Sequence, residues 1–192
     1  MIRSDDIKKA ALQLFAFRGY DATSMQDIAD AVGIKKATIY SHFKSKSDIF
    51  LALLQEQADL FTNTITAALA KSGATEIKDL LYEVFDANVR LYNDKTNLLF
   101  WKRAELLAAG FSEMDIQIQL KLIMDNMNSL VQMNVQKAFM EKGMEPDSRW
   151  VGKCMLSFML FLHGYLEWMM LSETYEAMDT RAAWENFWNG LG

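Results

Sequence analysis

A basic stretch in the first quarter of the chain has the residue types that bind nucleic acid. Between Asp30 and Asp48 the sequence has no acidic residue, although the whole chain is acidic, with 25 Asp and Glu against 20 Lys and Arg. The stretch contains Lys35, Lys36, Tyr40, His42, Lys44 and Lys46. Lysine attracts phosphate and donates to guanine, and tyrosine can reach a phosphate. A run of charged residues is more often a solvated face of a helix. The secondary structure expected around these residues therefore distinguishes a nucleic-acid-binding surface from a solvated face.

The residues before this stretch have the pattern of a short helix. In TSMQDIADAVG, residues 23–33, Thr23 or Ser24 is a candidate N-cap, and Asp27 completes a variant of the capping box. Gly33 is a candidate left-handed stop. The apolar residues that share one helical face are Met25, Ile28, Ala29 and Val32.

A second helix is expected directly after this stop, with Ile39 and Phe43 on its inner face. The small Ala29 permits a close crossing of the two helices, and Gly33 can adopt the positive φ of a tight turn. The spacing therefore predicts a helix-turn-helix. The outward residues are then Lys35, Lys36, Ala37, Thr38 and Tyr40, with Ser41 and His42 beside them. Such a helix fits the DNA major groove, where lysine reads guanine and threonine contacts a thymine methyl group.

The first fifty residues closely resemble the DNA-binding domain of TetR-type transcriptional regulators. The resemblance rests on LFAFRGYDATSM and on DIADAVGIKKATIYSHFKSKSDIF. It implies base reading by Lys35, Lys36, Ala37 and Thr38. It also implies phosphate contacts from Thr23, Ser24, Tyr40, His42 and Lys46. Many members have glycine at the position of Ala37, and the lysine pair replaces a commoner pair of a small polar residue and lysine, so the operator sequence does not transfer from a relative.

Composition and charge divide the chain into a small basic part and a larger acidic part. Residues 1–50 carry eight Lys and Arg against six Asp, and the remainder carries twelve against nineteen. With one proline and nine glycines in 192 residues, the chain favours helix throughout. We therefore expect an all-α protein with a helix-turn-helix DNA-binding domain at 1–46 and a helical effector-binding and dimerisation domain at 47–192. Helices are predicted at 47–72, 75–92, 95–109, 113–142, 147–173 and 179–190.

The sequence favours a cytoplasmic protein. The N-terminus lacks the apolar run of a signal peptide, and the single Cys154 lies among apolar residues. The segment CMLSFMLFLHGYLEWMML, residues 154–171, approaches the length of a membrane span, but it contains His163 and Glu167 and has no basic flank. We interpret it as a helix of a folded domain and expect no membrane association.

The sequence also predicts no enzyme, metal site or cofactor. It has no GxSxG, HExxH, P-loop or dinucleotide-binding motif. Two histidines and one cysteine lie too far apart to suggest a zinc site.

The larger part has a few polar residues among apolar and aromatic ones, as small-molecule pockets do. The predicted effector-binding residues are Phe85, Asn88, Tyr92, Phe100, Trp101, Met124, Met127, Phe158, Met159, His163 and Glu167. An ordinary packed core has the same pattern at helical spacing, and His163 with Glu167 could equally be a buried pair. Both interpretations stay open at this point.

The last two helices are expected to form a homodimer. Residues 154–171 are apolar almost all round, and Trp184, Phe187, Trp188 and Leu191 form a stripe on the final helix. A dimer would place two helix-turn-helix units on the half-sites of a palindromic duplex. We therefore predict a repressor that a small apolar or amphipathic effector releases from its operator. The alternatives are a helical carrier of apolar compounds without DNA function, and an architectural DNA-binding protein without effector.

Overall fold

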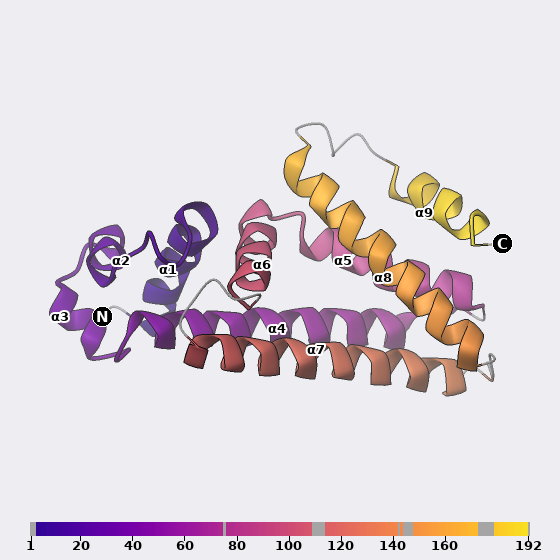
Figure 1. Cartoon of the computed structure of the whole chain (residues 1–192), viewed down its shortest axis with the longest axis horizontal. Coiled ribbons are helices and arrows are strands. Elements are labelled where there is room, and N and C mark those ends of the chain that lie inside the picture. The colour runs from indigo at the N-terminus through magenta and orange to yellow at the C-terminus, as the bar shows by residue number, and fades with distance from the viewer. Residues whose placement is uncertain are drawn as a thin grey trace. The chain divides into compact units, whose positions relative to one another are not determined.

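The computed structural model describes residues 3–74, 76–108, 114–141, 143, 148–172 and 179–191, and these ranges contain helices and connections but no strand (Figure 1). The helices are α1 (Ser4–Arg18), α2 (Met25–Val32), α3 (Lys36–Tyr40), α4 (Lys46–Lys71), α5 (Ile77–Leu91), α6 (Lys95–Ala108), α7 (Met114–Glu141), α8 (Ser148–Leu171) and α9 (Thr180–Asn189). The predicted all-α class is confirmed. The predicted ends of α4 to α9 differ from the observed ends by at most two residues.

The described chain forms two compact units. The first comprises Met1–Leu60 and Asp94–Asn128, and the second comprises Phe61–Asn93 and Ser129–Gly192. The first unit thus includes α6 besides the three N-terminal helices. The long helices α4 and α7 each have one part in either unit.

An aromatic group around Phe50 forms the centre of the first unit. The ring of Phe50 lies 5.3 Å from that of Phe15, 5.1 Å from that of Tyr20 and 5.2 Å from that of Phe100, measured between centroids. These rings come from α1, the connection after it, α4 and α6. Edge and tilted contacts of this kind add to the free energy gained by burying the rings. These ring contacts hold α1, which precedes the helix-turn-helix, against α4, which follows it.

A second aromatic group surrounds Trp184 in the second unit. Trp184 of α9 is fully buried, stacks on Phe85 of α5 at 5.9 Å, and meets Phe158 of α8 edge-on at 5.9 Å. Tyr82, Phe161, Phe187 and Trp188 also lie within 6.1 Å of its ring. The predicted stripe on the last helix therefore begins with a residue buried in its own subunit. The large apolar area of Trp184 holds α9 on α5 and α8.

Helix α8 contains the one segment of the described chain, Gly152–Leu171, that is long and apolar enough to cross a membrane by length and composition. About 33% of its apolar window is buried within this chain. The buried residues include Phe158, Leu162 and Tyr165, and Phe158 and Tyr165 contact the aromatic rings of α5 and α9. A core helix of a soluble domain passes the same test, so this segment alone is weak evidence for a membrane.

Candidate nucleic-acid interface

The capping box predicted for the first helix of the helix-turn-helix is present. The backbone N–H of Asp27 donates to Ser24 Oγ at 3.1 Å, and the backbone N–H of Ser24 donates to Asp27 Oδ2 at 2.8 Å. The Ser24 hydroxyl also donates to this carboxylate. The hydrogen bond from the Ser24 side chain, with that from its backbone, lowers the pKa of Asp27. The box satisfies donors that the start of a helix leaves free.

Gly33 makes the turn between α2 and α3. It has φ 76° and ψ 35°, the left-handed conformation, and the N–H of Ile34 donates to the carbonyl of Ala29 at 3.0 Å. Residues with a Cβ rarely adopt this conformation, so glycine at this position has a clear physical reason. The turn places α3 four residues after the end of α2.

Helix α3 presents a basic surface to solvent. Ile39 is fully buried and anchors the helix, while Lys35, Lys36, Ala37, Thr38 and Tyr40 are all exposed. Within the described ranges no carboxylate forms a salt bridge with Lys35, Lys36 or Lys44. The four residues predicted to read bases thus lie together on the surface, and the two lysines among them have no ion-pair partner in the described ranges. Contact with DNA remains a prediction.

The residues predicted to contact phosphate divide into two sets. Ser24, Tyr40 and His42 are exposed. Thr23 is buried, and its hydroxyl donates to the carbonyl of Gly19 at 2.8 Å. Lys46 donates to the carbonyl of Tyr20 at 2.7 Å, and its Nζ lies 4.1 Å from the centre of the Tyr20 ring. The side chains of Thr23 and Lys46 therefore hold the loop after α1, a role that the sequence did not reveal.

The predicted effector residues do not converge on one described cavity. Those in the first unit are Phe100 and Trp101, both buried, and the half-buried Met124; the side chain of Met127 lies outside the described part. Those in the second unit are the buried Phe85, Asn88, Tyr92 and Phe158, the half-buried Met159, and the exposed His163 and Glu167. Phe85 and Phe158 belong to the aromatic group around Trp184. The polar pair on α8 faces away from that group.

Buried polar atoms of the second unit that lack a hydrogen-bond partner among the described residues include Asn88 Oδ1 and Trp184 Nε1. The amide nitrogen of Asn88 donates to the carbonyl of Val84 at 2.8 Å, so only its oxygen is left. Buried polar atoms are normally satisfied, and each exception calls for an explanation. One acceptor and one donor thus lie unsatisfied in an otherwise apolar interior.

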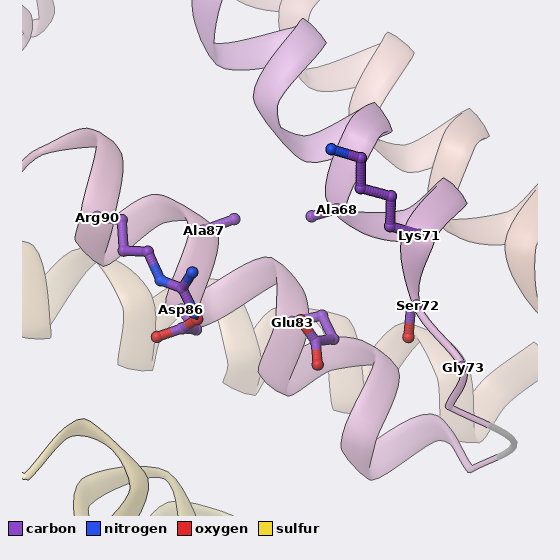
Figure 2. A pocket seen from close by; sticks show the side chains of 8 residues that line it. All are labelled: Ala68, Lys71, Ser72, Gly73, Glu83, Asp86, Ala87 and Arg90. Carbon is purple, nitrogen blue, oxygen red and sulfur yellow. The ribbon is translucent and has the colours of Figure 1, made fainter.

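A cavity of about 250 Å³ in the second unit has a different lining from the predicted one. It lies where the end of α4 faces α5, and the methyl groups of Ala68 and Ala87 point toward each other across it (Figure 2). The charged residues around it are Lys71, Glu83, Asp86 and Arg90, and Arg90 pairs with Asp86. Sequence reasoning missed this cavity because each of these residues reads as an ordinary solvated charge on its own helix.

The described residues contain no group of three or more His, Cys, Asp or Glu side chains that could hold a metal ion. Burial raises the pKa of Cys154, which keeps its thiol protonated.

The N-terminal helices, with a capped α2, a glycine turn and an exposed basic α3, define a helix-turn-helix of the DNA-binding class. Residues 7–53 match the family described as bacterial regulatory proteins, tetR family. Residues 7–53 are therefore a DNA-binding domain of the TetR family type, as the first fifty residues indicated. The matched family consists of transcriptional regulators, which agrees with the prediction that the chain is not an enzyme.

Similarity to curated relatives is concentrated in the N-terminal part. The transcriptional activator FasR of Mycolicibacterium smegmatis is 42% identical over 60 residues, which are 31% of this chain and 27% of FasR. The negative regulator of the biofilm operon icaADBC, IcaR of Staphylococcus aureus, is 31% identical over 99 residues, 48% of this chain and 53% of IcaR. The chain thus matches about half or less of the length of these relatives.

The fold of the whole chain also has solved counterparts. A transcriptional regulator from Saccharomonospora viridis, crystallised in complex with choline, has a TM-score of 0.73 and 17% identity, covering 98% of this chain and 94% of that one. At this identity the likeness concerns the fold alone.

Proposed function

We propose that this protein is a cytoplasmic transcriptional regulator that binds a palindromic operator as a homodimer. The observation that carries the proposal is the exposed surface of α3, which has two adjacent lysines and no paired carboxylate in the described structure. Lys35, Lys36, Ala37 and Thr38 would face the major groove. Ser24, Tyr40 and His42 would contact phosphates on either side, and Thr23 and Lys46 would keep the adjoining loop in shape.

The experiment is operator binding by two lysine variants. The operator is first selected from genomic fragments that the purified protein enriches. Lys36→Ala should weaken binding by about 1 to 3 kcal/mol and relax the preference at one base pair. Lys121→Ala, a change at another exposed lysine, on α7, is the matched control and should leave affinity unchanged. Equal loss in both variants would show that lysines act here only through overall charge.

The homodimer is supported by the open face of α8. Leu156, Leu160 and Leu171 are 63%, 68% and 74% exposed, and their helical spacing places them on one face with His163 and Glu167. A run of exposed leucines at this spacing is typical of a surface that another helix covers. Because Trp184 faces its own subunit, we propose that α8 contributes more of the interface than α9.

A charge on this face tests the dimer. Leu160→Glu should give a folded monomer that binds the operator poorly, because a buried unpaired carboxylate opposes association. Leu122→Glu, at a leucine of α7 that is 57% exposed, is the matched control and should stay dimeric. Light scattering with circular dichroism reads the mass and the helix content. A monomeric parent at micromolar concentration would exclude this interface.

We further propose that a small apolar or amphipathic effector binds in the second unit and alters operator affinity. The unsatisfied Asn88 Oδ1 and Trp184 Nε1 support this proposal, because a polar group of a ligand that reached either atom would satisfy it. The relative from S. viridis carries choline, which makes choline a reasonable first compound to test. FasR is an activator and IcaR a negative regulator, so the relatives include both signs of regulation. We propose repression, and a reporter gene under the operator would test whether the protein lowers or raises expression.

Asn88→Leu tests the assignment of the effector site. It removes the acceptor and keeps a similar volume, so it should leave operator binding intact and weaken an effector found by tryptophan fluorescence about tenfold. His163→Ala, on the exposed face of α8, serves as a comparison. If His163→Ala weakens the effector and Asn88→Leu does not, the effector lies at the open face of α8 instead.

A further inference from the structure

The first unit contains a groove of about 330 Å³ that none of the predicted DNA or effector residues lines. It lies where the end of α1 and the loop after it face α6. Its walls include Arg18, Tyr20, Ala22, Arg103, Leu106 and Leu107. A volume above about 300 Å³ is within the range of ligand sites in proteins.

Arg103 of α6 binds the end of α1 at this groove. Its Nε donates to the carbonyl of Ala16 at 2.7 Å, and its Nη2 donates to the carbonyl of Phe17 at 3.2 Å. Nη1 lies against Gly19, where an added Cβ would stand 3.0 Å away. A guanidinium has five N–H donors, so these two hydrogen bonds leave part of its capacity unused. Arg103 is thus held in place with donors to spare.

A second guanidinium lies at the same groove. Arg18 is in the last turn of α1, its side chain is 58% exposed, and its nearest carboxylate, that of Asp27, is 3.8 Å away. This separation is longer than a hydrogen bond. The acid in the lining is Asp21, which is exposed. Two cations against one acid make the lining positive in a chain whose net charge is −5.

The other wall of the groove is apolar. Leu107 is buried, and Leu106 beside it is 59% exposed. Exposure of this apolar area to water is unfavourable, and a bound alkyl group that covered it would gain free energy of binding. The groove therefore combines a positive end, rich in donors, with an apolar wall.

We propose that this groove binds a small carboxylate that carries a short alkyl chain. The carboxylate pairs with Arg18 and with the remaining donors of Arg103, and the alkyl chain covers Leu106. Guanidinium and carboxylate match in geometry and form strong, charge-assisted hydrogen bonds. Because the walls come from α1 and α6, a ligand here selects the arrangement in which these helices pack together. An effect on operator affinity rests on the proposed function; the binding itself does not.

The test is calorimetric titration of the full chain with three probes that share one chain length: octanoate, octan-1-ol and octyltrimethylammonium. The parent protein should bind octanoate about tenfold or more tightly than octan-1-ol, because the charged head group adds its hydrogen bonds. Octyltrimethylammonium should bind least, because the lining is positive. Equal affinity for octanoate and octan-1-ol would overturn the proposal.

Two pairs of variants place the binding at this groove. Leu106→Gln should weaken octanoate about threefold to tenfold through the lost apolar contact, while Leu122→Gln, at a leucine of similar exposure on α7, should not. Arg18→Gln should weaken octanoate and leave octan-1-ol unchanged, while Arg90→Gln in the second unit should change neither. Octanoate binding that is unchanged in both Leu106→Gln and Arg18→Gln would overturn the assignment.

Operator binding is measured separately, with and without octanoate. A parent that binds octanoate as expected but binds no DNA would refute the proposed function and leave the groove assignment intact. A parent that binds its operator but shows no preference for octanoate would refute the groove assignment and leave the proposed function intact.

Discussion

The turn at Gly33 permits a prediction whose magnitude follows from its geometry. Its φ of 76° is left-handed, and a Cβ added there would meet no atom within 4 Å. Gly33→Ala therefore introduces backbone strain without a steric clash. The strain of an L-residue in this conformation is about 1 to 2 kcal/mol. For a chain of this size, that corresponds to a fall in Tm of roughly 2 to 8 °C.

Two further variants separate strain from other effects of substitution. Gly33→Asn should cost less than Gly33→Ala, because asparagine tolerates the left-handed region. Gly73→Ala makes the same chemical change at a glycine that also has open space but no positive φ. It should stay within about 0.5 kcal/mol of the parent, or gain slightly in stability.

Urea unfolding followed by circular dichroism gives the free energy of unfolding of each variant. If the helix-turn-helix unfolds separately from the rest of the chain, hydrogen exchange of the α2 amides should rank the variants in the same order of stability. Operator affinity should fall in that order too, because α3 depends on this turn. Equal stability of Gly33→Ala and Gly73→Ala would refute the reasoning.

Three other predictions follow from local geometry. Ser24→Ala should lower stability by about 1 kcal/mol through loss of the N-cap, measured by urea unfolding. The lowered pKa of Asp27 contributes stability that is present above its unfolded pKa and lost as pH falls below about 4, so Asp27→Asn should flatten the acid limb of a stability titration. Trp184→Ala should cost about 3 to 5 kcal/mol, and Trp188→Ala, at a half-buried site, clearly less in the same assay.

The helix-turn-helix could be predicted from sequence because each of its signals is local. Ser24 and Asp27 are three residues apart, and Gly33 ends the same helix that they begin. Ile39 was correctly expected to be buried. Phe43 was placed on the inner face of the second helix, but α3 ends at Tyr40, so Phe43 follows the helix and is half-buried.

The remaining features depend on contacts between distant parts of the chain. The contact of Lys46 with Tyr20, 26 residues away, could not be predicted from spacing, and the phosphate contact of Lys46 stays a prediction. Likewise, the hydrogen bonds of Arg103 reach carbonyls 86 and 87 residues earlier in the chain. His163 and Glu167 were placed among effector residues because they interrupt an apolar run, yet helical phase turns both toward solvent in this chain. Spacing gives the face of a helix, but not which partner covers it.

The chain passes from one unit to the other at three points, and two of these lie inside helices. The third, between Asn93 and Asp94, lies in the connection between α5 and α6. Leu60 and Phe61 are neighbours within α4, and Asn128 and Ser129 are neighbours within α7. A protease that cuts between helices therefore cannot release one unit intact, because α4 and α7 continue from one unit into the other. Chimeras that combine the first unit of this protein with the second unit of a relative must be joined in mid-helix at two of their three junctions. One residue added at such a joint turns everything beyond it by about 100°, so only additions of whole turns, such as seven or eleven residues, would keep the helical faces in phase.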